Sequence, residues 1–259
     1  MPRKRFRVVL LLTILLAIAW LAATSRPPPP PDWDDPLRVV IYPHNADGSE
    51  AVTRFIADRR LEDFLPIEDF FAEQASRYHL GLQRRFTLAL GPEIEQAPVL
   101  PPRSRNFFTR LGWGLSVRWW HFRFRDLVNQ PDIIVIARYH DRHELPEHMH
   151  SIAIAAQRLA VAKLVADDLH SANNHVIIAH EILHTVGASD LYDPNNGQPL
   201  YPQGYAEPDR ARRYPQRRAE LMAGRIPLAP NNFREPIGLV EVVIGEHSAR
   251  EIGWIGAAP

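Results

Sequence analysis

The distribution of apolar and polar residues along the chain predicts alternating strands and helices. Short runs of β-branched and aromatic residues predict strands at 37–42, 86–90 and 132–137. Residues 49–61 and 67–80 have the spacing of helices, with Pro66 at the start of the second and Gly81 just past its end. This alternation favours an α/β (α+β) fold.

Two further segments extend the pattern. Residues 104–125 predict a helix whose many aromatic side chains pack in the core, with arginine stems covering the edge. Contact with a membrane interface is the alternative, because tryptophan and arginine together suit that zone. Residues 151–166 are mostly apolar, and we interpret them as two short strands, although their alanine content also permits a helix.

The N-terminal segment has a different pattern. Basic residues at positions 3, 4, 5 and 7 precede residues 8–23, which are apolar apart from Thr13. This apolar stretch is short for a membrane span of about 20 residues and slightly long for the apolar part of a cleaved signal peptide, about 7–15 residues. We favour a signal anchor over residues 1–26, which leaves its basic flank in the cytoplasm and places the rest of the chain outside.

The composition of the remaining chain fits one large domain. Residues 27–36 contain a run of prolines from Pro27 to Pro31, which predicts a stiff spacer, and residues 37–259 are long enough for a sizeable core. Thirty basic residues balance thirty acidic residues, so charge does not argue for nucleic acid. The absence of cysteine excludes disulfides, thiolate zinc sites and cysteine nucleophiles. Any metal ligands must be histidines or carboxylates.

The most specific motif lies near residue 180 and reads His-Glu-x-x-His-x-x-Gly-x-x-Asp. His180 and His184 are four residues apart on a predicted helix, so both imidazoles can reach one metal ion. Glu181 lies beside that ion, where it can take a proton from a water molecule. Gly187 suits the end of the helix, and the chain can then return Asp190 as a third ligand. Three protein ligands are typical of catalytic Zn²⁺.

Alternatives to this arrangement exist within the same region. Asp193 and Glu207 are rival third ligands, but Gly187 favours the nearer Asp190. The pair of histidines could also lie on the surface of an amphipathic helix without binding metal. A separate cluster of histidines, between His140 and His150, is interpreted as an exposed loop around Pro146, with a second metal site or part of the substrate cleft as alternatives.

The motif resembles that of the metzincin zinc metallopeptidases. Their usual third ligand is histidine, but secreted bacterial peptidases of the snapalysin type have aspartate there, like Asp190. The resemblance implies a mixed twisted sheet with an active-site helix, and it makes Met222 the counterpart of the methionine in a tight turn beneath the metal. Some metzincins place a tyrosine two residues after that methionine, where this chain has Gly224. Tyr192, Tyr201 and Tyr205 are then the other candidates for stabilising the oxyanion.

Metzincins also pair extended substrate with an edge strand that precedes the active-site helix. The resemblance implies this role for Leu159 to Val165. The amino-acid sequence of the same region, from His184 to Asp193 and around Met222, also resembles a group of uncharacterised proteobacterial membrane-anchored proteins. That likeness implies a single-pass protein of the inner membrane with its domain in the periplasm, or a secreted protein if the N-terminal segment is cleaved.

Together these patterns predict an exported, membrane-tethered zinc metallopeptidase. Glu181 would activate a zinc-bound water for attack on the peptide bond of a peptide or protein substrate. The alternatives are a non-catalytic metal-binding protein of the cell envelope and a zinc amidase that acts on cell-wall peptides. Sequence does not separate the last from a protease, because the motif fixes the chemistry and the cleft fixes the substrate. It also leaves the oligomeric state open.

Overall fold

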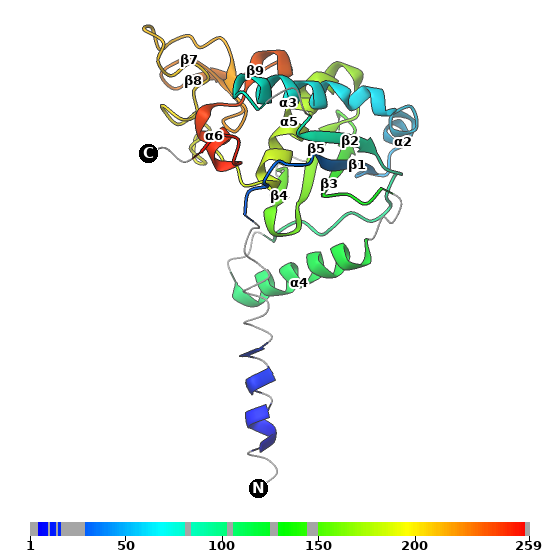
Figure 1. The fold of residues 1–259 in the computed structure, drawn as a ribbon. Coiled ribbons are helices and arrows are strands. Elements are labelled where there is room, and N and C mark those ends of the chain that lie inside the picture. The colour runs from blue at the N-terminus through cyan, green and yellow to red at the C-terminus, as the bar shows by residue number, and fades with distance from the viewer. Residues whose placement is uncertain are drawn as a thin grey trace.

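The computed structural model of the protein describes residues 5–9, 11–13, 15–16, 29–80, 84–102, 106–124, 129–143 and 150–256 (Figure 1). The described parts of the N-terminal segment are helical, but the predicted anchor at 1–26 lies mostly outside the described residues. No helix in the described ranges is both long and apolar enough to cross a bilayer. Trp33 lies inside the predicted spacer, yet it is buried and donates its Nε1–H to the carbonyl of Ile252 at 2.7 Å. The folded domain therefore begins before residue 37.

A five-stranded sheet forms the centre of the domain. Its order is β2-β1-β3-β5-β4. Strands β1, β2, β3 and β5 are parallel, and the short β4 runs antiparallel to β5. The bounds are β1 Leu37–Asn45, β2 Phe86–Leu90, β3 Ile133–His140, β4 Ile152–Ile154 and β5 Leu159–Val165. All three strands predicted from apolar runs are confirmed, and so are the two short strands predicted within 151–166. The predicted α/β class is confirmed as well.

Both faces of the sheet are covered, which explains why its central strands are apolar at successive positions. In β1, Val39 and Ile41 enter a large core cluster, whereas Val40 and Tyr42 enter a smaller cluster on the other face. The larger core lies under the helices α2 (Glu50–Ala57), α3 (Leu65–Arg77) and α5 (Ser171–Thr185). A 3₁₀ turn at Leu61–Phe64 separates α2 from α3, so the predicted helix over 49–61 is shorter than expected.

Helix α4 (Phe107–Arg123) lies on the opposite face, where it packs over the smaller cluster (Figure 1). The predicted helix is confirmed, but its predicted burial is wrong for the outer side. Val117 is the only residue of α4 that is fully buried, and Phe108 and Trp119 are 77% and 61% exposed. The helix is apolar on both sides, so its composition resembled that of a core helix although only one side meets the core.

The C-terminal part of the chain surrounds one end of α5 with short elements. Strands β6 (Ala219–Glu220) and β9 (Val242–Val243) pair in parallel, and β7 (Ile226–Ala229) pairs antiparallel with β8 (Asn232–Arg234). A 3₁₀ turn at Leu239–Glu241 precedes β9, and helix α6 (Glu246–Glu251) follows it. Side chains of this part, such as Met222 and Ile244, complete the larger core cluster.

The edge strand predicted from the resemblance is not β5. β5 pairs with β3 on one side, and its first half pairs with β4 on the other. The strand at the edge of the sheet is β4, which also precedes α5 in the chain and packs beside it. The prediction of an edge is therefore wrong for Leu159–Val161, because the intervening Arg158 adopts a left-handed conformation (φ 45°) and lets β4 fold back along this half of β5. Pairing with substrate along Leu159 to Val165 stays a prediction.

Candidate metal centre

Helix α5 brings His180 and His184 together at its C-terminal end. One face of the helix carries Ile178, Ile182 and Leu183 into the core, which fixes its rotation relative to the sheet. The two histidine side chains lie at the edge of that buried face, 15% and 19% exposed. Their Nε2 atoms are 3.0 Å apart. The four-residue spacing thus gives the shared site that the sequence predicts.

Backbone carbonyl groups orient both imidazole rings. The Nδ1–H of His180 donates to the carbonyl of Leu221 at 2.9 Å, and that of His184 donates to the carbonyl of Ala188 at 2.8 Å. A carbonyl only accepts, so each Nδ1 carries a proton and each Nε2 faces the centre, where the neutral form of the ring offers a lone pair to a metal. Histidines that bind metal are commonly held in this way.

A sharp turn after α5 brings the candidate third ligand, the carboxylate of Asp190, to the centre. Gly187 has φ 115°, a conformation that side-chain-bearing residues rarely adopt. Ser189 then donates from its backbone N–H and its hydroxyl to the carboxylate of Glu251 in α6, at 2.9 and 2.5 Å. Asp190 follows, and its Oδ1 lies 3.2 Å from Nε2 of His180 and 3.2 Å from Nε2 of His184.

These three atoms have the spacing that a zinc ion requires. Tetrahedral zinc with bonds of about 2.0–2.1 Å holds its ligand atoms about 3.3 Å apart. The observed separations are 3.0, 3.2 and 3.2 Å. Three electron-rich atoms this close repel one another unless a cation or a proton lies among them. The donor set of two imidazoles and one carboxylate also suits Zn²⁺, and a three-ligand set leaves a position open for solvent or substrate.

Glu181 lies beside this triangle of ligand atoms and is 5% exposed. Ligand atoms of His180, Glu181 and His184 all lie within 4.8 Å of one another. The buried Oε2 of Glu181 has no hydrogen-bond partner in the described part of the chain. A buried carboxylate oxygen without a partner is costly, so this position is suited to a donor that is not part of the protein.

The charges of the cluster influence one another. Burial acts to raise the pKa of Asp190, but hydrogen bonds from His180 and His184 outweigh it and hold that pKa well below its usual range. Burial acts to lower the pKa of His184, but Asp190 and Glu181 outweigh it, so the net shift is upward. Burial raises the pKa of Glu181 despite the two nearby histidines. The metal-free cluster therefore holds protons that a cation would displace.

The turn predicted to lie beneath the metal is present, and Met222 within it is fully buried. Its backbone is held by Glu220, whose Oε2 accepts from the N–H groups of Met222 and Ala223 at 2.6 and 3.0 Å. The Oε1 atom of the same carboxylate accepts from the N–H of Gly245 and the hydroxyl of Ser248. Glu220 thereby fixes the turn that presents the Leu221 carbonyl to His180. No sequence pattern points to Glu220 or Glu251, because their partners are distant along the chain.

A cavity of about 270 Å³ adjoins the centre. Glu181 and His180 line one side, and Tyr192, Arg225 and Glu235 line others. The guanidinium of Arg225 packs near the rings of Tyr192 and Phe233 and donates to the carbonyl of Gly197 at 3.0 Å. Burial and the charge of Asp190 raise the pKa of Tyr192, so its hydroxyl keeps its proton. Arg225 lines the cavity but was not predicted from the sequence.

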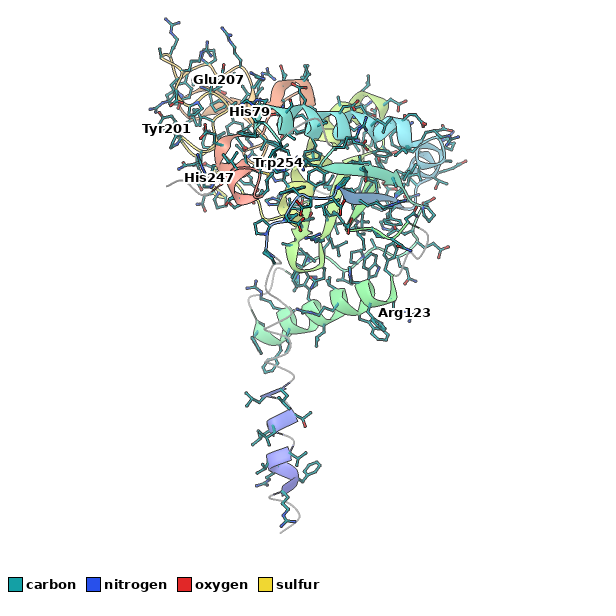
Figure 2. The ribbon with its side chains drawn as sticks, viewed as in Figure 1. His79, Arg123, Tyr201, Glu207, His247 and Trp254 are labelled. Carbon is teal, nitrogen blue, oxygen red and sulfur yellow. The ribbon has the colours of Figure 1, made fainter. Side chains whose placement is uncertain are left out.

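The structure separates the rival candidates from the centre. The carboxylate of Asp193 accepts hydrogen bonds from Asn195 and Asn196 within its own turn. Glu207 lies 3.7 Å from Arg210, and Figure 2 shows it with Tyr201 over the C-terminal part of the domain. The hydroxyl groups of Tyr205 and Tyr214 are hydrogen-bonded to each other, with 2.9 Å between their oxygens. Of the three tyrosines considered for the oxyanion, Tyr192 alone lines the cavity.

The histidine cluster between residues 140 and 150 divides into separate environments. His140 is buried at the end of β3, so the prediction of an exposed loop is wrong for it. His143 is exposed, and His148 lies outside the described residues. His150 lines the cavity next to His180, as the alternative of a cleft residue predicts. Elsewhere in the described chain, no other group of histidines and carboxylates is spaced to hold a metal ion.

Comparisons with known proteins add no assignment. A scan against protein families finds no match to this chain. A search of curated proteins also finds no match.

Proposed function

We propose that this protein is an exported, membrane-tethered, zinc-dependent metallopeptidase that hydrolyses peptide bonds. The observation that carries the proposal is the triangle of Nε2, Nε2 and Oδ1 atoms with sides of 3.0–3.2 Å, beside a buried glutamate oxygen that has no partner in the described chain. A structural zinc site would have four protein ligands and would not require an unpartnered carboxylate beside the metal.

Each residue has a distinct part in the proposed reaction. His180, His184 and Asp190 would hold Zn²⁺, which when bound acts as a Lewis acid toward water and the substrate carbonyl. Glu181 accepts the proton of the attacking water and later gives it to the leaving amine. The Tyr192 hydroxyl, which lines the same cavity, is the group placed to donate to the carbonyl oxygen as negative charge develops.

The surroundings of the centre support an extended peptide as substrate. Among the described residues, strand β4 is the last strand of the sheet and pairs only with β5, so its other edge is open. Main-chain groups at such an edge pair with an added strand. Ser151, next to β4, lines the cavity together with His180 and Glu181, so a peptide along this edge would pass the proposed metal position.

The proposed location rests on the N-terminal segment. Apolar side chains in its described helical residues, including Phe6, Leu11 and Leu16, are 53–70% exposed and make no core contact. Exposed apolar helix after a basic flank is typical of a segment that inserts into a membrane. Alkaline extraction of membranes should leave the full chain in the pellet. A soluble, shortened chain would instead show that the segment is cleaved and the protein secreted.

Metal content and peptide hydrolysis test the activity. The purified chain should contain one zinc ion and cleave casein or members of a peptide library. Glu181→Gln should keep its zinc and lose about 10²–10⁴-fold in rate, because it removes only the general base. His184→Ala and Asp190→Ala should lose zinc and activity together. His143→Ala is the matched control, since His143 is exposed and outside the centre, and it should change neither.

Other outcomes select the alternatives. Zinc without hydrolysis of any peptide would favour a non-catalytic metal-binding protein of the cell envelope. Cleavage of cell-wall peptides but not of proteins would favour a zinc amidase. A wild-type chain that binds no zinc would overturn the proposal, and zinc retained by Asp190→Ala would show that the third ligand lies elsewhere.

A further inference from the structure

Helix α4 exposes a continuous apolar stripe on its outer side. Phe108, Leu115, Trp119 and Phe122 are 77%, 47%, 61% and 58% exposed. At roughly 100° per residue these four positions fall within about 60° of one another around the helix. Val117, which is 2% exposed, lies on the opposite side. The stripe is therefore a single surface rather than a set of scattered apolar residues.

The inner side of α4 is attached to the domain by hydrogen bonds and by packing. The indole N–H groups of Trp113 and Trp120 donate to the carbonyls of Val99 and Gln96, each at 2.8 Å. Trp113, Val117 and Trp120 also pack against the smaller core cluster. The helix is thus held in a fixed orientation that directs the stripe outward. Folding of the domain does not explain why the outer positions are aromatic.

The charged side chains of α4 are all basic. The helix contains Arg110, Arg118 and Arg123, together with His121, and residues 107–123 include no aspartate or glutamate. Arg118 and Arg123 flank the stripe on its two sides, and the guanidinium of Arg123 lies 5.9 Å from the ring centroid of Trp119. Figure 2 shows Arg123 at the C-terminal end of α4. Tryptophan with arginine is the combination found where proteins meet lipid headgroups.

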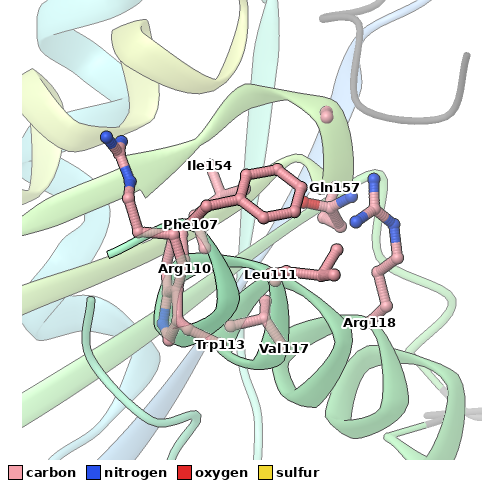
Figure 3. Close-up of a pocket in the computed structure, with 10 residues that line it drawn as sticks. Phe107, Arg110, Leu111, Trp113, Val117, Arg118, Ile154 and Gln157 are labelled. Atoms are coloured by element: carbon pink, nitrogen blue, oxygen red, sulfur yellow. The ribbon is translucent and has the colours of Figure 1, made fainter. Parts of the chain in front are cut away.

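A groove beside the helix continues this surface inward. It has a volume of about 520 Å³ and lies between α4 and the segment that follows β4. Figure 3 shows Phe107, Leu111 and Val117 within it, with Arg110 and Arg118 on opposite sides of this apolar lining. An apolar floor between two guanidinium groups suits an amphiphile whose headgroup is anionic.

The same charge argues against a second copy of the chain as the occupant. A twofold contact through the stripe would bring the arginines of one α4 near those of the other, with no carboxylate on either helix to pair with them. An anionic bilayer has the complementary charge and takes the apolar side chains into its acyl boundary.

We propose that α4 lies along the surface of an anionic phospholipid bilayer, with Phe108, Leu115, Trp119 and Phe122 inserted below the headgroups and Arg118 and Arg123 at the headgroup level. This contact would fix the orientation of the domain on the membrane, in addition to any tether at the N-terminus. The inference does not depend on the hydrolytic reaction, and it stands or falls independently of the metal site.

The absence of cysteine in the chain allows a direct test with the full-length protein. Phe108→Cys, Leu115→Cys and Phe122→Cys each introduce a single thiol for an environment-sensitive fluorophore. Val240→Cys is the matched control, because Val240 is 82% exposed and lies outside α4. The labelled chains are reconstituted into vesicles of phosphatidylcholine with phosphatidylglycerol, and into vesicles of phosphatidylcholine alone.

In the anionic vesicles, the emission of the α4 labels should shift to shorter wavelength, and their quenching by aqueous acrylamide should fall several-fold. The emission and quenching of the Val240 label should not change. The protection should be weaker without phosphatidylglycerol. Arg118→Glu with Arg123→Glu should reduce it, and Arg217→Glu with Arg218→Glu, an equal charge change at exposed positions elsewhere, should not. Circular dichroism and thermal unfolding show whether the variants remain folded.

Two results would overturn the proposal. Labels on α4 that are as accessible to acrylamide in anionic vesicles as the label at Val240 would show that the stripe does not enter the bilayer. Protection that appears in detergent without lipid and increases with protein concentration would show that a second copy covers the stripe.

Discussion

Glu220 shows how much a single buried side chain contributes to the centre without touching it. Its carboxylate accepts four hydrogen bonds, three from backbone N–H groups and one from Ser248. Both oxygens are fully occupied by donors, and the residue has no exposed surface. Loss of the side chain would leave several buried donors without a partner, and each of these costs about 1–3 kcal/mol.

Replacing Glu220 should therefore affect both stability and metal binding. Glu220→Ala should lower the free energy of unfolding by about 3 kcal/mol or more, because at least two buried N–H groups lose their acceptor. Glu220→Gln should be milder but still destabilising, since its NH₂ group meets two donors. Urea denaturation and zinc titration provide the measurements. Glu246→Ala, at an exposed position nearby, is the control, and equal effects of the two alanine variants would contradict this role.

At the scale of single residues, sequence could predict which side chains meet at the candidate centre, but not the residues that support them. His180, Glu181, His184 and Asp190 lie within eleven residues, so helix geometry and one glycine turn suffice to bring them together. Glu220, Glu251 and Arg225 act through contacts with residues that are distant in sequence. A lone glutamate in a sequence carries no sign that it is buried.

At the scale of elements, the turn after α5 decides whether the third ligand reaches the centre. Gly187→Ala would place a side chain at φ 115° and 3.4 Å from the carbonyl oxygen of Glu251. We expect a loss of about 1–3 kcal/mol from backbone strain, and weaker zinc binding because Asp190 moves. Gly48→Ala is the matched control: its φ is 74°, but it has open space around it. It should lose stability and keep its zinc affinity.

The segment between β8 and β9 is held by an ion pair that predicts a pH dependence. Arg234 donates to both oxygens of Glu241 at 2.7 and 2.8 Å, and this holds the pKa of Glu241 down at about 2. A lowered pKa in the folded state adds stability above the unfolded-state pKa of 4.5, and this contribution is lost as the pH falls from 4.5 toward 2. Both side chains are partly exposed, so the contribution is under about 1 kcal/mol.

Glu241→Gln tests this prediction. The variant should be slightly less stable than the wild type at pH 6, and the difference should shrink as the pH falls below 4.5. Thermal unfolding over a series of pH values provides the comparison. Glu246→Gln, which removes an exposed pair with Arg250, serves as the control. A difference that grows on acidification would contradict the assigned sign.

Helices and strands were predictable from the sequence where all their apolar positions are buried in the core. The central strands have apolar residues at successive positions because both faces of the sheet are covered, and this pattern is visible in sequence. Helix α4 has an apolar inner side and an apolar outer side, and composition does not distinguish a core from a second, exposed surface. The pairing of β4 with β5 depends on the left-handed Arg158, which no local signal predicts.

At the scale of the whole molecule, metal binding should stabilise the fold. The ligands come from α5 and from the turn tied to α6, so a bound ion would connect these two parts. Removal of zinc by a chelator should lower the unfolding temperature, and free zinc at about one hundred times Kd corresponds to about 2.7 kcal/mol. Asp190→Ala should respond less to the chelator, and Glu181→Gln should respond like the wild type. An unchanged unfolding temperature in the wild type would contradict a metal that bridges these parts.

The contact between Ser189 and Glu251 also has a consequence for biosynthesis. The segment that carries Asp190 is anchored by α6, and the carbonyl that orients His180 is held through Glu220 by Gly245 and Ser248. A ribosome-bound chain that has exposed α5 but not residues 245–251 lacks both supports. Under the proposed function, hydrolytic competence would arise only after synthesis has passed residue 251, so a nascent or truncated chain would be inactive.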